Sequence, residues 1–185
     1  IHVSAALALH KQLLPALEHL EAVLKRKASQ LDGVLKTGRT HLMDAMPIKL
    51  AQEISAWAEQ IHKARKRLLD TQKQRCQLAQ GATAVGTGVN SPDLFSEKFC
   101  LAISIDTGLS FKPNSSLFEA LSSQDTAVAA SGQLKALAVA LMKISNDLRW
   151  MNSGPLAGLG EIRLPALQPG SSIMPGKVNP VIPEA

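Results

Sequence analysis

Apolar residues recur at helical spacing through most of the chain and predict four helical segments. These segments cover residues 2–29, 48–80, 92–108 and 117–152. The apolar stripe of the first segment consists of Leu13, Leu17, Leu20 and Leu24. Pro15 interrupts this stripe. Because its ring removes a backbone donor and crowds the preceding turn, it should kink or split the helix.

The last segment is the longest and carries the most regular stripe. Its apolar positions step by three and four residues and are Leu134, Leu137, Leu141, Ile144, Leu148 and Met151. This spacing is typical of helical bundles and coiled coils. Small residues occupy much of the remaining surface, so that neighbouring helices can approach on more than one side. We therefore expect this helix inside a multi-helix bundle formed by more than one subunit.

The stretches between these helices contain only short strand patterns. Residues 34–37 are predicted to form a short extended piece that leads into an ordered loop at residues 38–41. Residues 161–165 are predicted as another short strand, and Gly81 to Asn90 as a glycine-rich loop. The sequence therefore predicts an all-α fold, a long antiparallel helical bundle with only short extended pieces in the connecting loops.

Composition narrows the class of protein. The 45% hydrophobic content excludes a disordered chain, and no window approaches the length of a membrane span. The net charge of +5 is modest. The densest run of basic residues, Lys63–Arg67, indicates a solvated helix face rather than a nucleic-acid-binding patch, because no aromatic residues accompany it. Cys76 and Cys100 have no metal-ligand or disulfide spacing. We expect no nucleic-acid or membrane partner, no metal and, without a visible targeting segment, a cytoplasmic location.

The residues with the clearest chemical content lie in the run from Pro169 to Pro180. Two adjacent serines follow a glycine, and a lysine and an asparagine come shortly after them. Glycines free the backbone of such a loop and prolines restrict it. A nucleotide-binding loop is excluded, because five residues rather than four separate Gly170 from Gly176, and Val178 follows the lysine.

This run resembles the signature loop of the fumarase/aspartase superfamily. Residues 38–45 and 81–90 resemble two further signature blocks, and residues 145–149 lead into Ser-Gly-Pro at 153–155 as they do in members of the superfamily. The sequence as a whole is similar to the class II fumarases. The resemblance implies that residues 1–185 are part of the central helical-bundle domain, truncated at both ends, of an enzyme that associates as a homotetramer. We expect this part alone to be inactive.

The resemblance also implies roles for five residues of the signature loop. Ser171 corresponds to the base that removes a proton from the substrate. Lys177 and Asn179 correspond to the residues that hold a substrate carboxylate, and Ser172 and the backbone of Val178 line the same pocket. A serine can act as a base only where backbone N–H groups and a cation stabilise its oxyanion, and this loop offers both.

Three residues outside that loop complete the implied site. His41, which follows the substrate-binding Thr40, corresponds to the histidine that works with a water on the hydroxyl side of the substrate. Glu184 corresponds to its carboxylate partner, which would fix the imidazole tautomer. The polar residues of the glycine-rich block are either supporting site residues or ordinary turn residues, and they are Thr83, Thr87 and Asn90.

The resemblance implies a hydro-lyase that interconverts fumarate and L-malate by anti addition and elimination of water, without a cofactor. Fixed N–H donors and an ammonium can stabilise the negative charge of the intermediate in place of a metal. Two alternatives stay open: an aspartate ammonia-lyase of the same superfamily, and a helical scaffold without catalysis. His41 and Gly176 favour the fumarase type, whereas residues 178–184 are also similar to aspartase, and Met43 and Leu156 depart from the common pattern.

Overall fold

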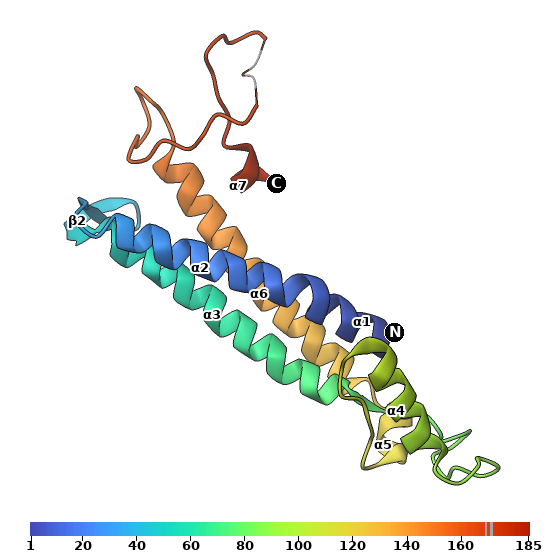
Figure 1. Ribbon diagram of the computed structural model, residues 1–185. Helices are drawn as coiled ribbons and strands as arrows, with labels where there is room; N and C mark the ends of the chain where they lie inside the picture. Colours follow the sequence, from blue (N-terminus) through green and yellow to red (C-terminus); the bar gives the residue numbers. More distant parts are fainter. Residues whose placement is uncertain (169, 171) are drawn as a thin grey trace.

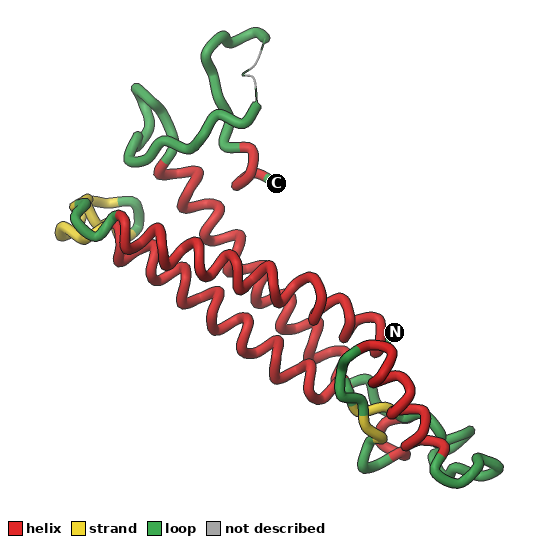
Figure 2. The backbone as a smooth tube through the Cα atoms, viewed as in Figure 1, coloured by secondary structure: helices red, strands yellow, loops and turns green. Residues whose placement is uncertain are grey.

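The computed structural model describes residues 1–168, 170 and 172–185. Its long helices are α2 (Leu14–Gln30), α3 (Leu50–Arg75) and α6 (Asp125–Met151). They lie side by side in an elongated bundle, in which α3 runs antiparallel to the other two and packs against both (Figure 1). The smaller elements gather at the two ends of this bundle, as Figure 2 shows. The predicted all-α bundle with short extended pieces in its connections is confirmed.

The N-terminal helical segment is continuous, although its geometry changes along its length. It consists of α1 (His2–Ala8), a π-helical turn η1 (Leu9–Leu13) and α2. Pro15 lies in the first turn of α2, directly after η1. Its ring crowds the carbonyl of the residue four positions earlier, and the wider π-helical turn accommodates that conflict. Instead of the expected kink or split, the helix therefore widens locally at η1 and continues.

The connection between α2 and α3 is a β-hairpin, not the loop predicted for residues 38–41. Strand β1 (Leu35–Thr40) pairs antiparallel with β2 (Met43–Lys49). The pairing was missed because apolar and polar residues do not alternate here, and Gly38 is the one buried residue of the two strands. A Cβ on Gly38 would lie 2.7 Å from the carbonyl oxygen of Met46, so the close approach of the strands requires glycine.

The main core lies along α3. Its buried positions repeat at the predicted three- and four-residue spacing and include Leu50, Ile54, Trp57, Ile61, Ala64 and Leu68. Leu14 and Leu17 of α2 pack into this cluster on one side. Three of the buried residues of α6 come from its predicted stripe and complete the cluster on the other side; they are Leu137, Ile144 and Met151.

A smaller core lies at the end of the bundle where α3 ends. The helix stops at Arg75 rather than near residue 80, because Gln77–Leu78 form strand β3, which pairs with β4 (Lys112–Pro113). The cluster joins this pair to α1 and to α4 (Phe95–Thr107); its buried members are Ala6, Cys76, Leu78, Cys100, Leu109 and Phe111. Both cysteines are free, and burial raises the pKa of each thiol.

The segment predicted as one helix over residues 117–152 forms two. Helix α5 (Leu117–Ser122) ends before Ser123, whose hydroxyl oxygen accepts the backbone N–H of Asp125 at 3.1 Å at the start of α6. Local bonds of this kind compete with helical hydrogen bonds and are not visible in the apolar spacing. Residues 161–165, predicted as a strand, have no regular secondary structure, and α7 (Val181–Glu184) follows the signature loop.

By length and composition alone, helix α6 could cross a membrane. The expectation that no stretch of the sequence approaches the length of a membrane span was therefore wrong. The many alanines of α6 raise the apolar character of the whole helix. Length and composition alone are weak evidence for a membrane span, and the stripe residues from Leu137 to Met151 pack in the core with α3, whereas Leu134 is exposed. Apolar side chains on its other faces are exposed, among them Val128, Val139 and Met142.

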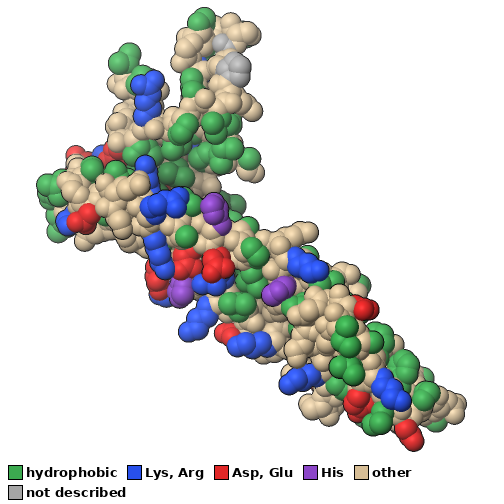
Figure 3. All heavy atoms as spheres, viewed as in Figure 1, with side chains coloured by type: hydrophobic (Ala, Val, Ile, Leu, Met, Phe, Trp, Pro, Cys, Tyr) green, Lys and Arg blue, Asp and Glu red, His purple; other side chains and the backbone are tan. Residues whose placement is uncertain are grey.

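A buried carboxylate connects α2 to α3. Glu21 is 6% exposed and lies 2.6 Å from the ammonium of Lys25, 3.1 Å from Nδ1 of His62 and 3.2 Å from Nε of Arg65. The hydrogen bond from Lys25, followed by those from His62 and Arg65, lowers the pKa of Glu21 despite its burial. Figure 3 shows acidic, basic and histidine side chains side by side along the bundle, so the basic run on α3 has acidic neighbours such as Glu59 beside Lys63.

Changing Glu21 to Gln should lower the free energy of unfolding near neutral pH by about 1–3 kcal/mol, because three donors lose a charged acceptor. Since the pKa of Glu21 is lowered from 4.5, its contribution is present above that pH and is lost as the pH falls through the folded-state pKa. When urea unfolding is measured at a series of pH values, the free energy of unfolding of Glu21→Gln should therefore fall less steeply towards acid pH than that of the parent. Glu18→Gln, on the exposed side of α2, is the matched control. An equally steep fall in Glu21→Gln would contradict this account.

Two adjacent leucines of α3 provide a test of the core. Leu68 is fully buried, whereas Leu69 is 38% exposed. Leu68→Ala should lower the free energy of unfolding by about 2–5 kcal/mol, because it leaves a cavity between packed helices. Leu69→Ala should cost less than about 1 kcal/mol. Equal losses in chemical denaturation would show that the helices do not pack as described.

Candidate active site

The predicted site residues lie in separate parts of the chain. The hairpin with Thr40 and His41 and the loops after α6 lie at one end of the bundle, and the glycine-rich block follows β3 at the opposite end (Figure 1). Ser171, the predicted base, lies outside the described residues. The remaining predicted residues fall into two groups, which we describe in turn.

His41 lies at the tip of the hairpin. Thr40 pairs with Met43, so that His41 and Leu42 form a two-residue turn, and their φ angles are 53° and 62°. Positive φ at both central residues is the geometry of a type I′ turn, whose twist matches that of the paired strands. The imidazole therefore projects from a tight turn, and Thr40, His41 and Leu42 are all exposed.

Lys177, Val178, Asn179 and Glu184 line one open groove of about 1220 Å³ beside the C-terminal end of α6. Its other walls come from that end of α6, from residues 152–155 and from residues 160–166. Ser172 is exposed and is not part of the lining. Neither Thr40 nor His41 lines the groove, and among the described residues no hydrogen bond or ion pair joins His41 to Glu184.

The groove has more positive groups than the signature loop alone would provide. Arg149 of α6 and Arg163 line it together with Lys177. Arg149 donates a hydrogen bond of 3.2 Å to the side chain of Asn146, which also lines the groove. Two carboxylates, those of Glu161 and Glu184, also line the groove, so the three cations leave it a net positive charge that favours an anionic ligand. The family block at residues 145–149 indicated this segment but no role for its arginine, because helical arginines are usually solvated.

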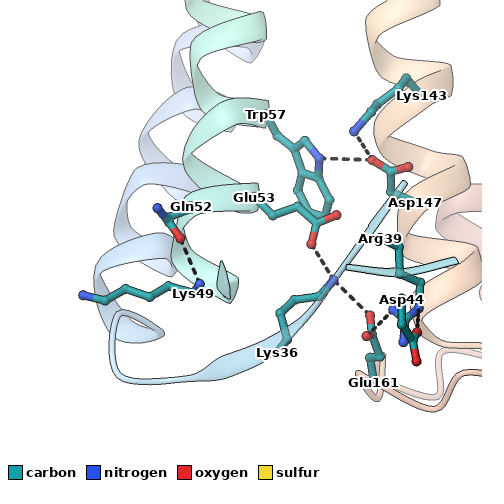
Figure 4. A network of polar contacts seen from close by, with 10 residues as sticks. All are labelled: Lys36, Arg39, Asp44, Lys49, Gln52, Glu53, Trp57, Lys143, Asp147 and Glu161. Atoms are coloured by element: carbon teal, nitrogen blue, oxygen red, sulfur yellow. Dashed lines mark hydrogen bonds and ion pairs between the residues drawn. The ribbon is translucent and has the colours of Figure 1, made fainter. Parts of the chain in front are cut away.

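A network of charges connects the hairpin to the loop after α6 (Figure 4). Lys36 of β1 lies 2.6 Å from the carboxylate of Glu53 on α3 and 3.0 Å from Oε2 of Glu161. The second contact is an ion pair between the ammonium and the carboxylate. Arg39 of β1 donates a hydrogen bond to the other carboxylate oxygen of Glu161 and lies 3.6 Å from exposed Asp44.

Burial makes this network sensitive to the loss of any one charge. The side chains of Lys36 and Glu161 are only 12% and 13% exposed. Burial opposes the charge of Glu161, but the hydrogen bond from Arg39 and the contact with Lys36 outweigh it, so the pKa of Glu161 lies below its ordinary value. Burial likewise opposes the charge of Lys36, and its two carboxylate partners still raise the pKa of the ammonium. The sequence gives no sign of this network, because its members lie far apart in the chain.

The glycine-rich block does not contribute to this end of the molecule. Thr83 lines a different cavity, of about 590 Å³, together with the first residues of α1 and part of α4. Thr83 and Asn90 have φ angles of 57° and 62°, and the hydroxyl of Thr83 donates to the carbonyl of Ala82 at 2.7 Å. Among the described residues, no group of three or more His, Cys, Asp or Glu side chains could hold a metal ion.

The sequence and the fold both identify the class of protein. A family model described as a lyase matches residues 1–185, and the chain therefore belongs to this lyase family. Over 185 residues it is 60% identical to a Pseudomonas aeruginosa protein named fumarate hydratase class II 2, and 59% identical to fumarate hydratase class II of Xylella fastidiosa strain 9a5c. The resemblance to class II fumarases is thus confirmed.

The solved structures agree with this result. A crystal structure of recombinant class II fumarase from Schistosoma mansoni matches 99% of this chain with a TM-score of 0.96 and 40% sequence identity. The chain covers 41% of that structure, and it covers 40% and 39% of the two sequence relatives. It therefore spans about two fifths of the length of the proteins that it matches.

The hairpin turn offers a test of the described geometry. A leucine with positive φ carries a steric cost of about 1–2 kcal/mol that glycine avoids. Leu42→Gly should therefore raise the free energy of unfolding by about 1 kcal/mol, since the turn already requires this conformation. Leu42→Ala removes the same exposed side chain but keeps the Cβ, and it should give no such gain in thermal unfolding. A loss of stability in the glycine variant would argue against the turn.

Proposed function

We propose that this chain is the central part of a hydro-lyase that interconverts fumarate and L-malate. The observation that carries the proposal is the match of all 185 residues to proteins named fumarate hydratase class II, at up to 60% identity. The signature residues lie within that match. Because the chain covers about 40% of those proteins, the activity is proposed for a protein of their full length, in which these residues belong to the central bundle domain.

In the proposed reaction, Ser171 removes the proton from the carbon beside one carboxylate of L-malate. The developing dianionic carboxylate needs fixed donors, and Lys177 and Asn179 supply an ammonium and an amide. The excess of cations over carboxylates in the groove supports this assignment, since Arg149 and Arg163 attract a dicarboxylate to the same place. Ser172 and the backbone of Val178 are proposed to contact the same carboxylate. No step of this scheme requires a cofactor.

On the opposite side of the substrate, His41 is proposed to handle the water that leaves or adds, with Thr40 beside it and Glu184 as the partner of the imidazole. Within one chain the hairpin tip and the groove are separate. We propose that they complete sites together with residues of other copies, in a homotetramer located in the cytoplasm. The exposed apolar face of α6 supports such an assembly, because packing against other copies would bury it.

The two alternatives differ from this proposal in one assay. A hydro-lyase adds water to fumarate, an ammonia-lyase of aspartase type adds ammonia, and a scaffold does neither. The two sequence relatives reported above are named fumarate hydratases, which favours the first. Fumarate absorbs in the ultraviolet, so its consumption with and without ammonium measures both activities.

Ser171→Ala tests the proposed base. The change is made in a chimaera in which these 185 residues replace the matching segment of the Pseudomonas aeruginosa protein. Because a general base contributes about 10²–10⁴-fold, kcat should fall by at least about 100-fold while assembly and thermal stability are unchanged. An unchanged kcat would remove Ser171 from this role. The unmodified 185-residue chain, assayed by itself, should be inactive.

A further inference from the structure

Glu161 occupies the point at which three parts of the structure meet. Its backbone N–H donates to the carbonyl of Met151 at 2.8 Å, which ties the loop to the C-terminal end of α6. Its side chain reaches β1 through Arg39 and Lys36, and Lys36 continues to Glu53 at the start of α3. Glu161 thus connects the end of α6 to the hairpin and, through Lys36, to α3; Figure 4 shows its side chain beside Lys36 and Arg39.

These contacts lie directly between the two groups of proposed site residues. Arg39 is the residue before Thr40 and His41, so its position constrains the hairpin tip. Glu161 itself lines the groove that Lys177, Asn179 and Glu184 share. Among the described residues, Glu161 is the lining residue whose side chain forms ion pairs with the hairpin.

We propose that Glu161 is a positioning residue, which holds the hairpin tip with His41 at a fixed place on the bundle, so that the tip reaches the site that it completes with residues of other copies. The role rests on the proposed function. The side chain of Glu161 is only 13% exposed, which favours the proposal, because a largely shielded carboxylate that holds two cations from one strand allows that strand few other positions. Arg39 contributes a guanidinium whose planar donors orient its partner, and Lys36 adds a second anchor three residues earlier.

A neighbouring cluster of the same chemistry provides the control. Asp147 of α6 accepts a hydrogen bond from Nε1 of Trp57 at 3.2 Å and forms an ion pair with Lys143. Lys143 also lies 5.9 Å from the centre of the Trp57 ring. Among the described residues, no hydrogen bond or ion pair joins this cluster to the hairpin, and Asp147 does not line the groove. Its loss should lower stability without moving His41.

The experiment compares Glu161→Gln, Glu161→Asp, Arg39→Gln, the double variant Glu161→Gln/Arg39→Gln and the control Asp147→Asn in the full-length chimaera. Glutamine keeps the size of the side chain and removes its charge, whereas aspartate keeps the charge. Steady-state kinetics give kcat and KM for fumarate. Hydrogen exchange of the amides in residues 35–49 reports on the hairpin independently of activity.

For Glu161→Gln we expect kcat to fall by about 10–100-fold with KM little changed, because a small misplacement of a catalytic group lowers the rate of the chemical step more than binding. Glu161→Asp should recover part of that loss. The double variant should be no slower than the slower single variant, since both changes break the same contact. Hairpin amides should exchange faster in Glu161→Gln and at the parent rate in Asp147→Asn.

Two results would overturn the proposal: hairpin exchange at the parent rate in Glu161→Gln, or faster hairpin exchange with kcat unchanged. Equal effects of Glu161→Gln and Asp147→Asn on kcat would likewise reduce Glu161 to a general stabilising contact. If the unmodified chimaera does not hydrate fumarate, the proposed function fails. The exchange measurement then still decides whether Glu161 holds the hairpin in place.

Discussion

The packing of α3 against two helices at once is the constraint on which the rest of the structure depends. Its buried side chains pack with leucines of α2 and with the stripe of α6. A helix with two such contacts must be apolar over a wide arc, and Ile61 and Leu68 show no exposed area as a result. Because α3 is fixed on both sides, the hairpin at its start and the small core at its end have defined positions.

Charged groups provide what apolar packing cannot, namely a preference for one arrangement of neighbouring elements. Glu21 joins α2 to α3 along the bundle, and Glu161 joins the connecting segments at one end. Glu21 is buried and has three cationic or histidine partners, whereas Glu161 is partly buried and pairs with Lys36 and Arg39. Buried charges of this kind add little net stability compared with apolar residues, but they are costly to leave unpaired, so they penalise displaced arrangements of the helices and loops.

The sequence carried most of the information on the helices and much less on the connections. Leucine spacing located α3 and the α6 stripe, because helix burial follows a fixed period. The hairpin was missed since its pairing depends on the missing Cβ of Gly38 and on backbone bonds that leave no apolar pattern. The family motifs predicted His41, Lys177, Asn179 and Glu184 as site residues. They gave no role to Glu161, because its partners are more than 120 positions away in the chain.

The length of α3 has a consequence for how the sequence can change. With 26 residues, the helix is about 39 Å long at 1.5 Å per residue, and it sets the span between the hairpin and the glycine-rich block. Replacing one side chain leaves that span intact. Inserting or deleting a single residue rotates everything beyond it by about 100° and breaks the apolar seam on both sides. Evolution of this helix should therefore proceed by substitution, with its residue count held constant.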